Sequence, residues 1–377
     1  MHGIYIHIPF CAQKCAYCDF LSFPGKHEKE KTQYLQALEH EIHGRVQGRW
    51  QHAQTIFIGG GTPTTLSADE LARLLAVIGG CVDLAGVQEF TVEANPGTID
   101  AEKLRVLRAG GVNRLSFGVQ SFDDALLKMI GRVHSAAEAE EAVRMAQHAG
   151  FTNINLDLMY GLPGQTAEQW KSTIDQALAL ALAPEHLSLY QLIPEPGTSL
   201  VHKMEAGLLP PVDEDGAAEW FEEQRTWLAE AGYRQYEISN YAREGFASKH
   251  NQLYWKLDDY LGLGLGATSW ERPRRSENTQ DFLLYTSALQ TGQAVPQHIE
   301  TLTREEQMSE SVFMALRMNQ GLSLADFTAL YGCTLESVFP AALEEGVRQG
   351  WLVIADDHLR LTERGRALGN WVFELFI

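Results

Sequence analysis

The chain has 377 residues, five cysteines and a net charge of −19 at neutral pH. This length suits a large α/β domain followed by a smaller one, and five cysteines in such a length do not make a disulfide scaffold. The acidic charge argues against binding to a phosphate backbone, so we expect no nucleic acid among the partners.

The first half of the chain repeats a unit of strand, loop and helix. Runs of β-branched and large apolar residues predict six strands, at 4–8, 55–58, 89–93, 114–118, 154–159 and 186–192. Capping boxes predict where three of the intervening helices begin: Ser67 with Glu70, Ser135 with Glu138, and Thr166 with Gln169. Strands that alternate with helices indicate a parallel sheet, either doubly wound or curled into a barrel.

Three cysteines, Cys11, Cys15 and Cys18, follow directly on the first predicted strand. A structural zinc site needs four ligands, usually in two separated pairs, and Cys81 and Cys333 stand alone far downstream. In an iron–sulfur cluster of four irons, three cysteines hold three irons and leave one open to a ligand. The motif therefore favours an iron–sulfur cluster, with a zinc knuckle or a chance grouping of cysteines as the alternatives.

Glycine-rich or polar residues recur where the next four predicted strands end. Gly59–Gly61 follow the second strand, Glu93 the third, Gln120 the fourth, and Asp157 lies at the fifth. If the sheet is a barrel, the carboxyl ends of its strands share one face, so these residues are expected to meet beside the cysteines. Taken singly, the glycines are equally typical of a tight turn, and each polar residue of a loop or surface group.

The spacing Cys-x3-Cys-x2-Cys, with Tyr17 just before the third cysteine, resembles the signature of radical S-adenosylmethionine (SAM) proteins. In that family three cysteines hold a [4Fe-4S] cluster and the open iron is chelated by the methionine part of SAM. One electron from the reduced cluster then cleaves SAM to a 5′-deoxyadenosyl radical. The resemblance implies a cluster, SAM and an electron donor, and the family's incomplete (β/α)6 barrel, open on one side.

In the oxygen-independent coproporphyrinogen III oxidase branch of this family, SAM contacts fall on motifs that match eight residues of this chain. These residues are Tyr5, Gly60, Gly61, Thr62, Glu93, Gln120, Arg132 and Asp157. The resemblance implies that Glu93 pairs with the SAM ammonium, Arg132 with its carboxylate, and Gln120 and Asp157 with the ribose hydroxyls.

After a predicted helix at 213–232 and a predicted strand at 235–239, the chain reads His250-Asn-Gln-Leu-Tyr254-Trp255. A histidine beside two aromatic residues is typical of a haem contact, with imidazole as axial ligand, but also of a packed histidine in a core. The motif resembles the haem-binding motif of HemW-type haem chaperones, relatives of the same oxidases, which implies that His250, Tyr254 and Trp255 bind haem. The nearby arginines either meet the haem propionates or belong to a solvated loop; they are Arg272, Arg274 and Arg275.

The last segment predicts a small domain of its own. Thr303 and Glu306 form a capping box that opens a helix through Met318. Further helices are predicted at 324–331, 338–349 and 362–376, with a hairpin at 351–354 and 358–361. This arrangement resembles a winged helix, but six Arg and no Lys stand against eleven Asp and Glu (6 − 11 = −5), which argues against DNA binding.

These observations together predict an α/β protein. We expect an incomplete (β/α)6 radical SAM barrel with its cluster and SAM site at 1–240, a connecting segment with the haem motif at 241–300, and a smaller winged-helix-like C-terminal domain at 301–377. The C-terminal domain of the coproporphyrinogen-oxidase-like family has the same arrangement, so the resemblance covers nearly the whole chain.

Three functions remain open. The resemblance favours a haem chaperone that binds the cluster, SAM and haem and delivers haem to haem-dependent, respiratory proteins. The alternative is an oxygen-independent coproporphyrinogen III oxidase, and the third is a radical SAM enzyme with an unrelated substrate. Position 20 is Phe where those oxidases carry a further cysteine, Cys11 lies too early for their long N-terminal extension, and the His250 motif is present. All three features favour the chaperone, and enzyme activity is left open.

We expect a cytoplasmic protein. The N-terminal residues show no basic stretch followed by an apolar one, no apolar run approaches the roughly 18 residues of a spanning helix, and thiolate ligands need a reducing compartment. The resemblance to chaperones of respiratory haem proteins implies at most transient membrane contact. Nothing in the composition itself indicates such contact.

Overall fold

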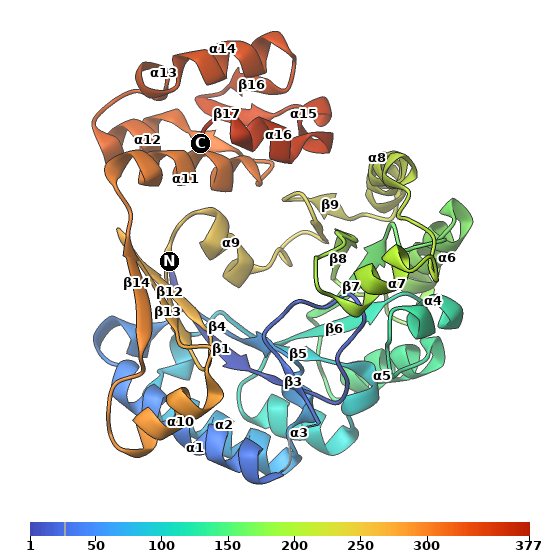
Figure 1. The fold of residues 1–377 in the computed structure, drawn as a ribbon, viewed down its shortest axis with the longest axis vertical. Helices are drawn as coiled ribbons and strands as arrows, with labels where there is room; N and C mark the ends of the chain where they lie inside the picture. The colour runs from blue at the N-terminus through green and yellow to red at the C-terminus, as the bar shows by residue number, and fades with distance from the viewer. Residues whose placement is uncertain (26–27) are drawn as a thin grey trace.

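The computed structural model describes residues 1–25 and 28–377, and its centre is a parallel sheet of the six predicted strands (Figure 1). These strands are β1 (His2–Ile8), β4 (Thr55–Gly60), β5 (Glu89–Ala94), β6 (Arg114–Gln120), β7 (Ile154–Tyr160) and β8 (His186–Gln191). They lie side by side in chain order. The outer edge of β1 pairs with β11 (Asp259–Leu263) and that of β8 with β10 (Asn240–Ala242), so the barrel stays open. The predicted incomplete (β/α)6 barrel is confirmed.

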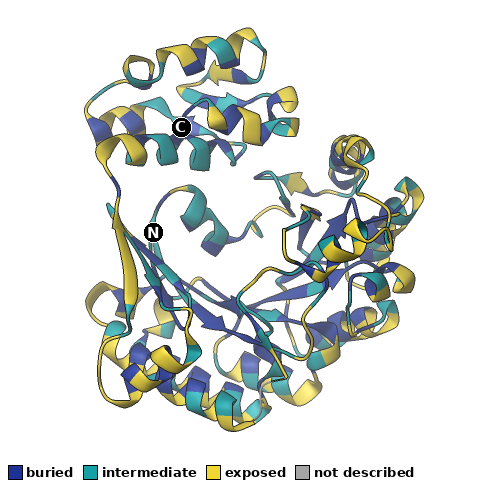
Figure 2. Cartoon of the chain, viewed as in Figure 1, coloured by how far each residue is buried: buried dark blue, intermediate teal, exposed yellow. Residues whose placement is uncertain are grey.

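Helices cover the convex face of this sheet (Figure 1). They are α1 (Glu28–Arg45), α2 (Ala68–Cys81), α3 (Ala101–Ala109), α4 (Asp124–Met129), α5 (Ala136–His148) and α6 (Ala167–Ala179). The capping boxes predicted from the sequence are formed at the starts of α2, α5 and α6. Figure 2 shows the strands buried and the outward faces of the helices exposed, which is the burial expected for a parallel sheet under a helical layer.

The segment 241–300, expected to be a connection, is instead part of the sheet. It supplies β11, β12 (Thr268–Glu271), β13 (Arg274–Asn278) and, with residue 301, β14 (Gln297–Thr301), while α10 (Phe282–Gln290) packs on α1. The backbone groups at the free edge of β1 need hydrogen-bond partners, and β11 provides them in parallel register. The haem motif forms a short helix, α9 (Lys249–Trp255), on the concave side of the sheet (Figure 1).

The predicted strand at 235–239 is wrong. The chain forms α7 (Ser199–Glu205), the predicted long helix α8 (Glu214–Glu230) and then only a short β9 (Arg234–Gln235) before it turns into β10. The turn forms because the buried carboxylate of Glu237 accepts hydrogen bonds from the Ser239 amide, at 2.9 Å, and from the Asn240 side chain. A side chain that bonds the backbone two residues on competes with strand pairing.

The C-terminal domain has its own small core and sits above the concave side of the sheet (Figure 1). Its helices are α11 (Arg304–Leu316), α12 (Leu324–Tyr331), α13 (Leu335–Val338), α14 (Pro340–Arg348), α15 (Glu363–Ala367) and α16 (Gly369–Glu374). Strands β15 (Leu322–Ser323), β17 (His358–Leu361) and β16 (Leu352–Ala355) pair in that order. The winged-helix-like arrangement is confirmed, but the predicted closing helix at 362–376 is broken at Leu368, whose ψ of 24° leaves the helical range.

None of the helices in the described parts of the chain is both long and apolar enough to cross a membrane.

Candidate functional site

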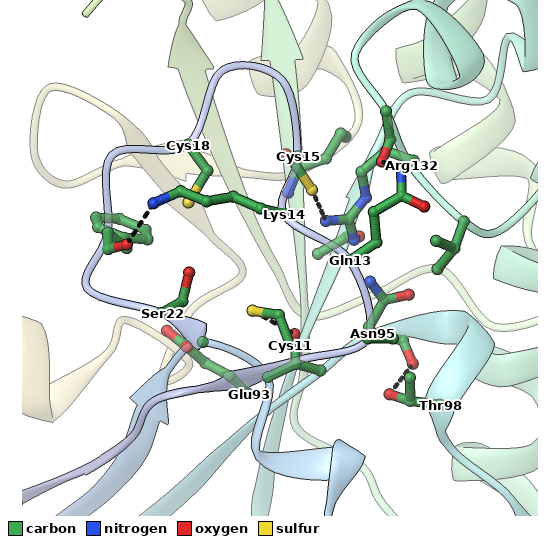
Figure 3. Close-up of a pocket in the computed structure, with 18 of the residues that line it drawn as sticks. Cys11, Gln13, Lys14, Cys15, Cys18, Ser22, Glu93, Asn95, Thr98 and Arg132 are labelled. Atoms are coloured by element: carbon green, nitrogen blue, oxygen red, sulfur yellow. Dashed lines mark hydrogen bonds between the residues drawn. The ribbon is translucent and has the colours of Figure 1, made fainter. Parts of the chain in front are cut away.

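The three cysteines lie on one loop that leaves the carboxyl end of β1. The base of the loop is closed by β2 (Phe10–Cys11) and β3 (Phe23–Pro24), which pair with each other. Its far side is tied to the barrel because the Ala16 amide donates to the Ile130 carbonyl at 2.9 Å. All three thiols are free and line a pocket of about 140 Å³ (Figure 3). The loop therefore presents Cys11, Cys15 and Cys18 to one space.

Side chains of the barrel donate hydrogen bonds to these sulfurs. Arg132 Nη1 lies 3.3 Å from Cys15 Sγ, and the Thr62 hydroxyl lies 3.7 Å from Cys11 Sγ. Donors of this kind stabilise thiolates that ligate a metal cluster. Burial raises the pKa of the Cys11 thiol, and it raises the pKa of the Cys18 thiol to about 11, so iron binding would displace protons from both.

The donor set fits an iron–sulfur cluster better than a single metal ion. Among the described residues, no three His, Cys, Asp or Glu side chains converge closely enough to hold one ion. The three thiols instead surround a pocket that also holds hydrogen-bond donors for sulfur. The zinc-knuckle alternative requires the closed convergence of ligands that this loop lacks.

The residues predicted at the strand ends do meet beside the cysteines. The walls of the pocket include seven of the eight predicted SAM contacts: Gly60, Gly61, Thr62, Glu93, Gln120, Arg132 and Asp157. In Figure 3 the carboxylate of Glu93 lies below the cysteine loop and Arg132 reaches in beside Cys15. The barrel brings together residues that are up to about 150 positions apart because its strand ends share one face.

The glycines at the end of β4 are required by space as well as by backbone shape. A Cβ at Gly60, whose φ is +112°, would lie 2.4 Å from the His7 ring, and a Cβ at Gly61 would lie 2.7 Å from the Phe10 carbonyl oxygen. The Gly60 amide donates to Glu93 Oε2 at 3.0 Å. The turn therefore packs against the first strand and leaves its backbone at the pocket wall.

The end of β6 carries a local distortion. Gln120 has a φ of +71°, and the pairing between β6 and β7 shifts register between Gly118 and Gln120. Arg132 donates to the Gly118 carbonyl, while Arg132 Nε is buried without a hydrogen-bond partner in the described chain. Strained backbone and an unpaired buried donor are both typical of a site that binds a ligand.

Two carboxyl groups share the inner end of the pocket. Burial and the neighbouring Asp157 raise the pKa of Glu93 to about 8, and burial also raises the pKa of Asp157. Asp157 accepts hydrogen bonds from Asn155 at 2.9 Å and Ser116 at 3.2 Å. A neutral Glu93 would become a carboxylate when a cationic group binds beside it.

We expect the Glu93→Gln variant to be more stable than the wild type at alkaline pH. Folding raises the pKa of Glu93 from its ordinary 4.5 to about 8, so the wild type loses stability as the pH rises through this window. Glutamine keeps the acceptor for the Gly60 amide without the ionisation. The gain should be roughly 1–3 kcal/mol near pH 9 and vanish near pH 4, measured by urea unfolding. A gain that is independent of pH would contradict this explanation.

Tyr5, the eighth predicted SAM contact, lies in an adjoining cavity of about 220 Å³. Glu93 and Asp157 line both spaces, and His250 and Tyr254 line the second one. Three polar strand residues of this inner cavity were not among the predicted site residues, namely Ser116, Asn155 and Ser188. Their signal was present, because each is a polar residue between two apolar neighbours in its strand.

His250 is held inside the barrel. Its side chain is 0% exposed, Nδ1 pairs with the Thr55 hydroxyl at 2.8 Å, Nε2 pairs with the Tyr254 hydroxyl at 2.9 Å, and its ring stacks on Phe57. Burial lowers its pKa to about 3, so the imidazole is neutral. Both ring nitrogens are therefore occupied, and this arrangement does not present His250 to a haem iron.

Trp255 does not line this cavity and instead lines a separate cleft that faces the C-terminal domain. The three arginines are not gathered around His250 either. Arg272 donates to the Tyr331 hydroxyl at 3.3 Å, and Arg275 forms an ion pair with Glu310 at 2.8 Å. Arg274 and Arg275 belong to β13, so the expectation of a solvated loop is wrong for them.

Comparison with known proteins agrees with the fold and with a radical SAM domain. Residues 5–177 match the Radical SAM superfamily and residues 302–368 the HemN C-terminal domain. The chain is 40% identical to "Heme chaperone HemW" of Bacillus subtilis, over 100% of this chain and 99% of that protein. It is 38% identical to the protein of the same name from Escherichia coli, over 100% and 98%.

Among solved structures, coproporphyrinogen III oxidase (HemN) from Escherichia coli superposes with a TM-score of 0.86 at 25% identity, over 100% of this chain and 89% of that one. The similarity thus runs through both the barrel and the C-terminal domain. With full-length identities of this size and the three cysteines in place at the mouth of the barrel, the chain belongs to the HemW family of radical SAM proteins.

Proposed function

We propose that this protein is a haem chaperone that holds a [4Fe-4S] cluster and SAM, binds haem and delivers it to haem-dependent proteins. The observation that carries the proposal is the 40% identity, over 99% of its length, to a relative named as a heme chaperone. The acceptors proposed are respiratory haem proteins, and the thiolate ligands suit the reducing cytoplasm.

In this proposal Cys11, Cys15 and Cys18 hold three irons of the cluster. When bound, the cluster supplies one electron to SAM and an open iron that fixes its methionine part. Glu93 receives the SAM ammonium as a carboxylate, because the added positive charge favours its ionised form. Arg132 binds the SAM carboxylate, for which its unpaired Nε is available.

The remaining predicted contacts position the nucleoside. Gln120 and Asp157 bind the ribose hydroxyls, and the backbone at Gly60, Gly61 and Thr62 closes the wall beside the methionine part. Tyr5 acts from the inner cavity, where its hydroxyl pairs with His7 Nδ1 at 3.0 Å. Reduction of the cluster would depend on an external electron donor.

The proposed haem contact is α9, which carries His250, Tyr254 and Trp255. The bonded pair of His250 and Tyr254 anchors the helix in the barrel, as does Glu89, which accepts from the His250 amide at 2.9 Å. Trp255 is the residue of the motif that a ligand between the domains can reach. The motif thus contributes one direct contact and two anchoring side chains.

The alternative function is oxygen-independent coproporphyrinogen III oxidase, which the whole-chain likeness to HemN favours. Both functions are tested on reconstituted protein. The chaperone is expected to bind about one haem per chain, to pass it to a haem-free acceptor such as apomyoglobin, and to release no carbon dioxide from coproporphyrinogen III in the presence of SAM and a reductant. Decarboxylation over many turnovers would assign the oxidase instead.

A further inference from the structure

A cleft of about 280 Å³ separates α9 from the C-terminal domain. One wall is formed by Trp255, Lys256, Leu257 and Arg272, and the other by side chains of α11, α12, β15 and β17. Figure 1 shows the C-terminal domain above α9. The cleft is separate from the cluster pocket and from the inner cavity of the barrel.

One histidine of this cleft has the hydrogen bonding of a metal ligand. His358 Nδ1 lies 2.8 Å from the Asp356 carbonyl oxygen, which only accepts, so Nδ1 carries the proton. Nε2 is therefore the nitrogen with a free electron pair, and no described residue donates a hydrogen bond to it. Histidines that ligate metals commonly donate their other N–H to a backbone carbonyl. His250, with both ring nitrogens bonded to side chains, lacks this property.

Part of the cleft wall is aromatic and apolar. Phe327 and Tyr331 are 2% and 7% exposed and belong to the core of the C-terminal domain, and Met318 lies beside them. Trp255 faces them from α9, where its ring also stacks under Arg317 at 4.4 Å. Aromatic side chains on two walls suit a flat, apolar macrocycle.

The charges at the cleft suit a ligand with carboxylates. Arg272, Lys256 and Asp326 line the cleft and together carry a net charge of +1. The chain as a whole carries a net charge of −19. The Arg272 guanidinium donates to the Tyr331 hydroxyl and forms no ion pair with a carboxylate of the described chain. Its other N–H groups are free to bind propionates.

We propose that haem binds in this cleft, with His358 Nε2 as axial ligand of the iron. Trp255, Phe327 and Tyr331 pack against the macrocycle, and Arg272 and Lys256 bind its propionates. The inference rests on the proposed function, since it locates the cargo of the chaperone. It places the axial ligand of the iron on β17 of the C-terminal domain instead of at His250 on α9.

The test is a haem titration of the full-length protein, followed through the Soret band, with the wild type, His358→Ala and Ala315→Trp. His358 is half-buried on a short strand, so its truncation leaves the core intact. We expect His358→Ala to weaken haem binding at least about tenfold and to shift the Soret band, and Ala315→Trp to block binding by filling the cleft. His298→Ala, on the exposed strand β14, is the matched control and should bind as the wild type does.

Failure of the inference is distinct from failure of the proposed function. A wild type that takes up no haem would refute both. If the wild type binds haem and both cleft variants bind it equally well, only the assignment of haem to the cleft is refuted. Loss of the axial-imidazole spectrum in His250→Ala but not in His358→Ala would show that the axial ligand is His250 on α9. Equal loss of iron-free protoporphyrin and haem affinity in His358→Ala would show that this side chain does not ligate the iron.

Discussion

Cys15→Ser is expected to abolish the iron–sulfur cluster. Cys15 lies at the middle of the loop, and its sulfur accepts a hydrogen bond from Arg132 at 3.3 Å, which stabilises the thiolate that iron requires. A serine hydroxyl does not ionise in this pocket and is a poor ligand for iron in such a cluster. Iron and acid-labile sulfide should fall from about four per chain to nearly none after reconstitution.

The control for this experiment is Cys81→Ser. Cys81 is a free thiol at the end of α2 and is not part of the pocket that the other cysteines line. It should keep the full complement of iron, and so should Cys333→Ser in the C-terminal domain. A Cys15→Ser protein that retains its cluster would show that this loop does not ligate it.

Arg132→Met is expected to weaken SAM binding strongly. The guanidinium lies between the Cys15 sulfur and the Gly118 carbonyl, and its Nε is left without a partner in the described chain. Loss of one member of a buried charge pair costs about 2–5 kcal/mol, so SAM affinity should fall by roughly 30-fold to several thousand-fold. Equilibrium dialysis of cluster-loaded protein measures this directly.

The iron content must be determined in parallel, because Arg132 also touches a cluster ligand. Arg132→Lys should give an intermediate affinity, since lysine keeps the charge but loses the planar fork. Arg105→Met, at an exposed position on α3, is the matched control. Unchanged SAM affinity in a cluster-loaded Arg132→Met protein would remove this residue from the site.

The architecture of the barrel was predictable from the sequence because its signals are local. The six strands are short apolar runs, and the capping boxes at Ser67, Ser135, Thr166 and Thr303 need only residues three positions apart. The predicted strand at 235–239 was wrong because the Glu237 side chain interferes locally with strand pairing after β9. The edge strands of segment 241–300 were missed because their pairing depends on distant partners such as β1.

The candidate SAM site was also predicted in outline, because the strand ends of a barrel share one face. The sequence could not show that burial, together with the nearby Asp157, raises the pKa of Glu93, nor that Tyr5 lies in a second cavity. It also could not show that Arg132 Nε would be left unpaired. These properties depend on distances between strands.

The sequence by itself determined the cysteine spacing, the order of strands and helices, and the family of the protein. Each of these depends on residues that are close together along the chain. Only the tertiary structure decided which side chains of α9 line which cavity. His250 pairs with Thr55, 195 positions away, whereas Trp255 faces a cleft shared with Tyr331 and His358. The reason is physical: a hydrogen bond or a cavity wall depends on which strands and domains pack together, and a linear motif cannot record that.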